Sequence, residues 1–428
     1  MPADLKSIRP KLHYAWIVAA VTFMVLLVGA GTRSAPSVLI VPLEQEFGWS
    51  RATISFAVAV NIFLYGMTGP FAAAIMDRFG IRRTIMGALA LVATGVVATI
   101  PMRESWQLVV LWGFVVGAGT GFTALVMASM IATRWFVKQR GLVMGLLTAS
   151  TATGQLVFLP LFAKLAEAYG WRMVAATLGC VAIATIIPVA LLLRDRPEDA
   201  GVTPYGADKA HVAPIRSTAN PFGTAFRVLS HGLRSRDFLL LAGTFFICGA
   251  STNGLIGTHL ISACLDHGIP EVAAASLLAV MGIFDFFGTT ASGWLSDRFD
   301  ARKLLFFYYG FRGISLIFLP YSFISFYGLS LFAVFYGLDW IATVPPTVRL
   351  TTKSFGEENV GVYYGWIGAA HQIGAASAAW LAGIVRVETG DYFYAFTFAG
   401  SLCLLAAVSV LFIGRGKPAE PLAVPVRA

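Results

Sequence analysis

The chain has 428 residues and a formal net charge of +9, with 57% hydrophobic and only 12% charged residues. A soluble domain has about 25% charged residues, so this composition excludes an ordinary soluble globular protein and indicates a chain that spans a membrane. The lysines and arginines form no continuous groove interleaved with aromatic residues, so the positive charge does not indicate nucleic-acid binding.

Long apolar stretches recur along the whole chain. A helix needs about 20 mostly apolar residues to cross the hydrocarbon core of a membrane. The sequence predicts twelve such helices, at 13–42, 52–75, 83–102, 106–132, 141–164, 172–193, 237–262, 272–295, 303–322, 326–349, 360–384 and 392–414. We therefore expect an all-α membrane protein in which two six-helix bundles, residues 1–193 and 237–428, are joined by a polar linker, residues 194–236.

Smaller features refine these elements. Pro345-Pro346 should kink or unwind the tenth apolar segment, because proline removes a backbone donor and clashes with the preceding turn. Pro70 and Pro160 should kink or unwind the second and fifth segments for the same reason. Within the linker, residues 221–233 could form a short amphipathic helix.

A charged motif occurs twice in the chain. Asp77-Arg78 and Asp297-Arg298 stand 220 positions apart, each in a short polar gap between two apolar segments. Five glycine pairs share this offset: Gly48 and Gly268, Gly141 and Gly361, Gly145 and Gly365, Gly154 and Gly374, and Gly170 and Gly390. Because glycine allows helix backbones to approach closely in lipid, the repeat predicts two similar halves with corresponding packing contacts, a plan known from transporters.

The distribution of basic residues predicts the orientation in the membrane. With the N-terminus inside, 24 of the 31 lysines and arginines lie in segments on the inner side. Positive residues collect on the cytoplasmic side of membrane proteins, so we expect both termini and the linker in the cytoplasm. The predicted location is the plasma membrane, as a multi-pass protein, with the bacterial inner membrane as the leading case.

Two six-helix halves with an Asp-Arg motif after the second and the eighth helix resemble the major facilitator superfamily. The superfamily pattern is Gly-x-x-x-Asp-Arg-x-Gly-Arg-Arg; the first copy here has Ala73 at its first glycine, and the second copy has Asp300 at its second glycine. The resemblance implies the major facilitator fold. It also implies a role in gating the cytoplasmic side for the four motif residues Asp77, Arg78, Asp297 and Arg298.

A second resemblance lies at the start of the fifth helix. The stretch 136–145 reads Phe-Val-Lys-Gln-Arg-Gly-Leu-Val-Met-Gly and is similar to the signature of the monocarboxylate transporter family, Tyr-x-Arg-Arg-Arg-x-Leu-Ala-x-Gly. The chain differs from that family in helix eight, where Thr289 follows Asp285 in place of an arginine, and in helix one, where Arg33 stands in the region of a lysine. The resemblance implies transport of a monocarboxylate together with a proton.

Four ionisable residues fall well inside the predicted helices: Arg33, Asp285, Arg312 and Asp339. Such residues are costly in a bilayer and are usually functional or paired. Arg33 is the candidate for binding an anionic substrate, because a guanidinium offers two parallel donors to a carboxylate; the alternative is an arginine that reaches the outer interface. Asp285 and Arg312 lie at similar depths on consecutive helices, so we predict an ion pair between them, with a proton-coupling or a structural role. Asp339 could carry protons, or could lie in a wet outer vestibule.

Uncharged polar residues and two histidines complete the candidate site. The residues predicted to line a substrate cavity with Arg33 are Asn61, Tyr65, Gln155, Asn253 and His371. His259 is predicted to take part in proton coupling, since histidine titrates near neutral pH. The alternative for each of these residues is a structural hydrogen bond between helices.

These features favour a secondary carrier that moves a small organic anion with a proton by alternating access. The alternative is an exporter of hydrophobic or amphipathic compounds in the same superfamily. An enzyme is not expected, because the chain has no phosphate-binding Gly-x-x-x-x-Gly-Lys-Ser/Thr loop and no His-Glu-x-x-His pair, and its four cysteines lack zinc spacing. We expect no cofactor, metal or nucleic acid; the expected partners are the anion, a proton and the lipid bilayer around a monomer.

Overall fold

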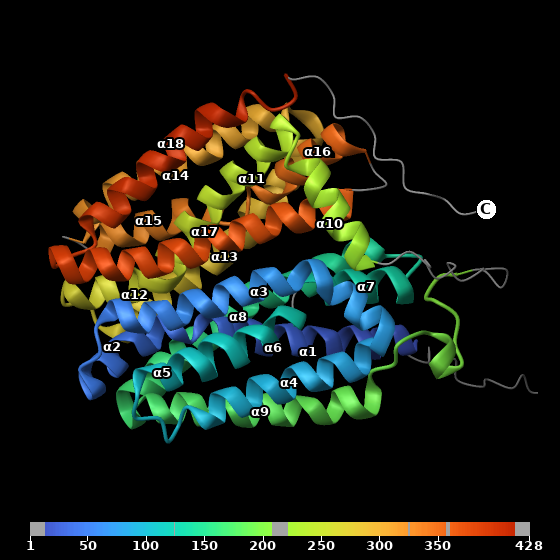
Figure 1. The fold of residues 1–428 in the computed structure, drawn as a ribbon, viewed down its shortest axis with the longest axis horizontal. Coiled ribbons are helices and arrows are strands. Elements are labelled where there is room, and N and C mark those ends of the chain that lie inside the picture. The colour runs from blue at the N-terminus through green and yellow to red at the C-terminus, as the bar shows by residue number, and fades with distance from the viewer. Residues whose placement is uncertain (1–12, 124, 208–220, 324–325, 357–359, 416–428) are drawn as a thin grey trace, which may run out of the picture.

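The computed structural model describes residues 13–123, 125–207, 221–323, 326–356 and 360–415. These residues form helices, and within them no β-strand occurs beyond one isolated bridge between Phe136 and Tyr205. Figure 1 shows the N-terminal helices in one half of the molecule and the C-terminal helices in the other, with their long axes running in a common direction. The prediction of an all-α fold is confirmed.

The N-terminal helices come first along the chain. They are α1 (Tyr14–Ser34), α2 (Pro36–Phe47), α3 (Arg51–Phe79), α4 (Ile81–Ala98), α5 (Ser105–Leu108), the π-helix η1 (Val109–Val116), α6 (Gly117–Phe122), α7 (Leu125–Trp135), α8 (Arg140–Tyr169) and α9 (Trp171–Leu192). The short 3-10 helix η2 (Glu198–Ala200) and the helix α10 (Pro221–Gly232) lie within the predicted linker. The position of α10 confirms the short helix that the sequence predicts there.

The C-terminal helices follow the linker. They are α11 (Arg236–Gly249), the π-helix η3 (Ala250–Ile256), α12 (Gly257–Asp266), α13 (Glu271–Arg298), α14 (Ala301–Ser322), α15 (Phe326–Asp339), α16 (Val344–Phe355), α17 (Val360–Thr389) and α18 (Phe393–Val410). The division of the chain into bundles at residues 194–236 stays a prediction.

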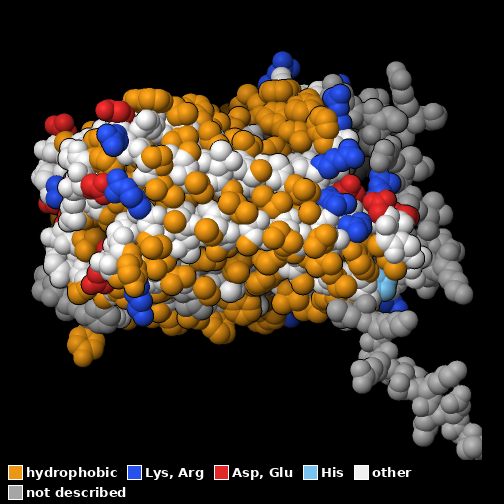
Figure 2. Space-filling view, turned by 90° about the horizontal axis from the view of Figure 1, so that it is seen from below, with side chains coloured by type: hydrophobic (Ala, Val, Ile, Leu, Met, Phe, Trp, Pro, Cys, Tyr) orange, Lys and Arg blue, Asp and Glu red, His pale blue; other side chains and the backbone are white. Residues whose placement is uncertain are grey.

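Ten helical segments of the described chain are long and apolar enough to cross a membrane. The remaining two predicted ranges, 141–164 and 360–384, are occupied by α8 and α17, which have 30 residues each but fall outside that set of ten. Large apolar side chains such as Phe318 and Phe398 are 65% and 66% exposed, and Figure 2 shows apolar side chains across the middle of one face with charged ones at its two ends. This distribution fits a molecule surrounded by lipid.

The tenth predicted segment is interrupted. The helix α15 ends at Asp339, and α16 begins at Val344 with Pro345 in its first turn, where a missing N–H costs nothing. The predicted unwinding is therefore confirmed. By contrast, α3 and α8 run through Pro70 and Pro160 as continuous helices.

Some glycine pairs of the repeat have the same structural role in both halves. Gly48 and Gly268 both take a positive φ, of 67° and 75°, at helix ends, where a side chain would be strained. Gly154 and Gly374 both lie where a Cβ atom would collide, with Ala30 and with the carbonyl of Phe246 respectively.

For another pair the packing prediction is wrong. A Cβ atom at Gly145 or at Gly365 would meet nothing within 4 Å. The repeat therefore marks corresponding turns and one corresponding close contact, but it does not mark a helix contact at every shared glycine.

The molecule has two distinct ends. We call the end with Gly80, α10 and Asp300 the linker end, and the end with Gly48 and Gly268 the far end; in Figure 1 the helices α10 and α16 lie at the right and α2 and α12 at the left. Between these ends the two sets of helices touch through the contacts of α3 with α17, α8 with α13 and α2 with α12.

Candidate functional site

A cavity of about 70 Å³ lies between the N-terminal and the C-terminal helices. Its polar lining comes from α1, α2 and α3 on one side and from η3, α12, α17 and the α15–α16 break on the other. The polar and aromatic lining residues are Arg33, Ser34, Ser37, Asn61, Tyr65, Asn253, Thr258, Trp340 and Gln372. A cavity that both halves build is the place where a solute would contact both of them.

Arg33 supplies the cation of this cavity. It lies near the end of α1, its Nη1 donates to the hydroxyl of Tyr65 at 3.2 Å, and its guanidinium carbon lies 4.8 Å from the centre of the Tyr65 ring. Its Nε is buried and has no hydrogen-bond partner among the residues that the structure describes. A buried donor without a partner is costly, and the Nε of Arg33 could donate to a further acceptor in the cavity.

The predicted polar residues divide into several groups. Asn61, Tyr65 and Asn253 line the cavity, although the Nδ2 of Asn61 already donates to the carbonyl of Trp112 at 2.7 Å. His371 is not among the described lining residues, and its ring packs against Phe245 with 4.7 Å between ring centroids. Gln155 belongs to α8, but its side chain lies outside what the structure describes.

The predicted ion pair between Asp285 and Arg312 is wrong. The Nε of Arg312 donates to Asp339 Oδ2 at 2.7 Å, and its Nη1 donates to the Sγ of Cys248 at 2.9 Å. Its Nη2 donates to the backbone carbonyls of Asp339 and Trp340. Several residues lie at the depth of Arg312 in the membrane, so depth alone does not identify its partner. The direction in which the side chain leaves its helix decides, and it brings Arg312 to Asp339.

Asp285 and Arg312 both stabilise the α15–α16 break. Asp285 Oδ1 accepts from the backbone N–H of Ile341 and from the hydroxyl of Thr289, both at 2.9 Å. A helix break leaves backbone donors and acceptors without intrahelical partners. The Asp285 carboxylate and the Arg312 guanidinium act as the missing partners. Trp340, whose carbonyl accepts from Arg312, lies in this break and in the cavity lining.

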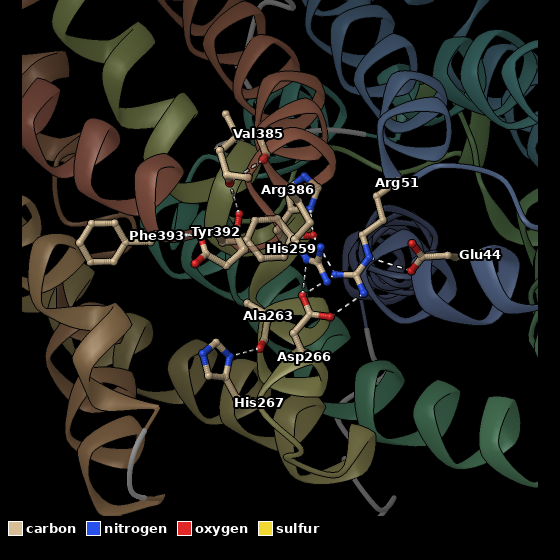
Figure 3. Close-up of polar contacts among 12 residues, drawn as sticks. Glu44, Arg51, His259, Ala263, Asp266, His267, Val385, Arg386, Tyr392 and Phe393 are labelled. Atoms are coloured by element: carbon tan, nitrogen blue, oxygen red, sulfur yellow. Dashed lines mark hydrogen bonds and ion pairs between the residues drawn. The ribbon is translucent and has the colours of Figure 1, made fainter.

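An ion network that the sequence does not predict joins the two halves at the far end (Figure 3). The Nε of Arg51 donates to Glu44 at 2.7 Å, and its Nη1 and Nη2 donate to the two carboxylate oxygens of Asp266 at 2.7 and 2.6 Å. Arg386 adds a second cation to Asp266 at 2.7 Å. Arg51 and Asp266 lie 215 positions apart. The sequence indicates their contact only weakly, because it places both residues at helix ends on the predicted outer side of the membrane.

His259 belongs to this far-end network and not to the cavity. Its Nε2 lies 2.7 Å from the carbonyl of Ala379, and its Nδ1 lies 3.1 Å from the hydroxyl of Tyr392. A carbonyl only accepts, so we assign the proton of a neutral imidazole to Nε2, and Nδ1 then accepts from Tyr392. The Tyr392 oxygen in turn accepts from Arg51 at 3.3 Å, which completes a chain of hydrogen bonds across the far end.

At the linker end the halves are joined by aromatic rings of α3, α10 and α17. Phe71 stacks on Phe222 at 5.3 Å and meets Trp366 edge-on at 6.2 Å, and the Nε1 of Trp366 donates to the carbonyl of Ala225. The cavity therefore lies between a charged contact and an aromatic contact that both bridge the two halves.

The four predicted gating residues lie at the linker end. Arg78, Asp297 and Arg298 are exposed, and the guanidinium of Arg298 lies 4.1 Å from the ring of Trp294. Asp77 belongs to α3, and its side chain is outside what the structure describes. Their role in gating stays a prediction. Among the described residues, no group of three or more His, Cys, Asp and Glu side chains could hold a metal ion.

Two relatives resemble the chain over nearly all of its length. An uncharacterized MFS-type transporter YcxA of Bacillus subtilis is 24% identical over 422 residues, covering 96% of each chain. Monocarboxylate transporter 13 of Rattus norvegicus is 26% identical over 406 residues, covering 94% of this chain and 89% of the relative.

Solved structures show the same fold. A crystal structure of a D-xylose-proton symporter matches with a TM-score of 0.72 at 15% sequence identity, covering 96% of this chain and 100% of that one. A family model described as Major Facilitator Superfamily matches residues 21–379 and 241–428. The chain therefore belongs to the Major Facilitator Superfamily of membrane transporters.

Proposed function

We propose that this protein is a secondary carrier that moves a small organic anion, a monocarboxylate, across the plasma membrane by alternating access. The observation that supports this proposal most directly is the unpartnered Nε of Arg33 in a polar cavity between the halves. In this proposal residues 1–193 rock against residues 237–428 around that cavity.

The chemistry of the cavity suits a carboxylate. The Nε and an Nη of a guanidinium can donate in parallel to the two oxygens of one carboxylate, and the contact of Arg33 with Tyr65 orients the guanidinium. Ser37, Asn253 and Thr258 offer further polar groups for a hydroxyl or keto oxygen next to the carboxylate. The relatives named as monocarboxylate transporters agree with this proposal.

The size of the cavity favours a small cargo. A volume of about 70 Å³ is well below the roughly 300–1,000 Å³ of pockets that hold drug-sized ligands. The alternative function, export of hydrophobic or amphipathic compounds, is favoured by the 13% aromatic content and by Thr289 in place of an arginine. The volume of the cavity weighs against it.

We place proton coupling on the buried charges next to the cavity. Asp339 Oδ2 accepts from Arg312, while its Oδ1 is buried and has no hydrogen-bond partner in the described part of the chain. An oxygen in this position can take up a proton without breaking an existing bond. Asp285 supports the same break, and His259 would add a proton-sensitive contact at the far end.

We also propose the orientation. The linker end carries the basic residues of both charged motifs, and positive residues collect in the cytoplasm, so the linker end faces the cytoplasm and the far end faces outward. In that orientation Asp77, Arg78, Asp297 and Arg298 would gate the cytoplasmic side, and the Arg51 network would close the outer side.

Counterflow in proteoliposomes tests the proposal. Labelled lactate and pyruvate should exchange across the membrane, whereas the uncharged analogue lactamide should not compete, because it cannot supply the negative charge that Arg33 requires. An inward proton gradient should accelerate uptake. Absence of exchange for every carboxylate, together with resistance of cells to a toxic amphipathic compound, would support the exporter instead.

A further inference from the structure

A second and larger cavity lies at the linker end of the N-terminal helices. It has a volume of about 640 Å³ and is bounded by the ends of α3, α4 and α7 and by the chain after α9. Its described charged lining consists of Arg78, Arg82, Arg83, Arg134, Arg196 and Asp195. Orientation in the membrane requires only that basic residues lie on the cytoplasmic side. It does not require five arginines to surround one cavity.

The two copies of the charged motif differ in one acidic residue next to this second cavity, which we call the arginine groove or, in short, the groove. In the second motif copy, Asp300 holds Arg302: the Nη2 of Arg302 donates to Asp300 Oδ2 at 2.6 Å, and its Nε contacts the same carboxylate. The Arg302 guanidinium lowers the pKa of the Asp300 carboxyl to about 2, so this pair is ionised at neutral pH. The first copy has Gly80 at the corresponding position, and Arg82 therefore has no local counter-ion of this kind.

The one described acid of the groove is already engaged. Asp195 Oδ1 accepts from the backbone N–H of Arg82 at 2.8 Å, at the first turn of α4. Gly80 has a φ of 87°, and a Cβ atom there would collide with the Asp195 carboxylate. The glycine therefore lets Asp195 bind the start of α4, and the guanidinium groups of Arg82, Arg83 and Arg196 have no ion-pair partner among the described residues.

We propose that this groove binds a phosphate group, carried either by an anionic phospholipid or by a free phosphorylated solute. A phosphate presents several strong acceptor oxygens, and arginine binds it with paired donors. The groove is large enough for a lipid headgroup, and it lies at the end of the helices, where headgroups surround a membrane protein. Its lining shares no residue with the central cavity, so its proposed role is regulation or anchoring and not cargo binding.

The test uses the melting temperature of the purified full-length protein in detergent micelles. A ligand that binds only the folded protein raises Tm, so phosphatidylglycerol should raise Tm more than phosphatidylcholine does. The variant R82Q/R83Q should lose this difference, with an apparent affinity for phosphatidylglycerol at least about tenfold lower. The matched control R302Q changes the corresponding arginine of the second copy and should keep the difference.

Inorganic phosphate separates the two sources. A rise in Tm with inorganic phosphate that R82Q/R83Q abolishes assigns the groove to a free phosphorylated solute, and a rise with phosphatidylglycerol alone assigns it to a lipid headgroup. If R82Q/R83Q does not fold, R196Q takes its place. Equal shifts with both lipids and no shift with phosphate, or shifts that the arginine variants keep, would overturn the proposal.

Discussion

Arg312 and Arg33, which both lie within membrane-spanning segments, differ in what surrounds them. Arg312 is only 1% exposed and donates to Asp339, to Cys248 and to two backbone carbonyls. Among the described residues, Arg33 has one hydroxyl partner, Tyr65, and its buried Nε has none. A sequence shows two cations inside apolar segments and cannot rank them, because the difference lies in neighbours from other helices. Arg312 therefore supports the backbone, whereas our proposal assigns Arg33 to the ligand.

The role of Arg312 predicts a large loss of stability on truncation. Arg312→Ala leaves Asp339 as an uncompensated buried carboxylate and leaves two carbonyls of the break without donors, so the free energy of unfolding should fall by about 3–5 kcal/mol. Arg302→Ala, which breaks an exposed pair with Asp300, should cost at most about 1 kcal/mol. Thermal unfolding in detergent compares them, and equal losses in the two variants would contradict this role.

At the scale of the helix, close backbone contact determines which glycines matter. The helix α17 contains Gly374, where a Cβ atom would collide with the carbonyl of Phe246 in α11, and Gly365, where a Cβ atom would meet open space. Both belong to the repeat, so the sequence assigns them equal weight. Only the packing of α11 on α17 separates them.

This contrast gives a matched pair of variants within one helix. Gly374→Ala should destabilise the protein by about 1–3 kcal/mol, because the helices must move apart. Gly365→Ala should be neutral or should stabilise it by about 0.5–1 kcal/mol, because alanine restricts the unfolded chain. The free energy of unfolding of both variants provides the measurement, and a Gly374→Ala variant as stable as Gly365→Ala would show that the close contact is not formed.

The helical elements could be predicted because each depends on local sequence. Apolar length marks most of the membrane helices, Pro345 marks the break after α15, and the amphipathic residues of the linker mark α10. The partner of Arg312 could not be predicted, since rotation about a helix axis depends on contacts with other helices. Arg33 and Tyr65 line the cavity as the sequence interpretation expects, whereas His371 is not among its described lining residues and packs against Phe245.

At the scale of the whole molecule, Arg51 is the principal charged link between the two halves at the far end. It binds Glu44 of its own half and Asp266 and Tyr392 of the other. Arg51 is 5% exposed, so these bonds are largely shielded from water and are stronger than exposed ion pairs. Opening of the far end requires the bonds of Arg51 to Asp266 and Tyr392 to break.

Spin labels on Gln45 and Glu388, exposed positions in α2 and α17, can follow this opening by pulsed distance measurement. Arg51→Ala should shift the distribution toward longer distances, and the charge exchange Arg51→Asp with Asp266→Arg should reverse part of the shift. Arg103→Ala, at an exposed site between α4 and α5, serves as the control and should leave the distances unchanged. A distribution in Arg51→Ala identical to that of the wild type would rule out the network as a closure.

The most direct measurement is equilibrium binding of lactate or pyruvate, whichever exchanges faster, to the purified wild-type protein and to Arg33→Ala. Loss of a paired, charge-assisted contact should weaken binding by about tenfold or more. The Tm without ligand should stay unchanged, because the hydroxyl of Tyr65 is the one hydrogen-bond partner of Arg33 among the described residues. Equal affinity in the two proteins would contradict the conclusion that Arg33 receives an anionic cargo in the cavity between the halves.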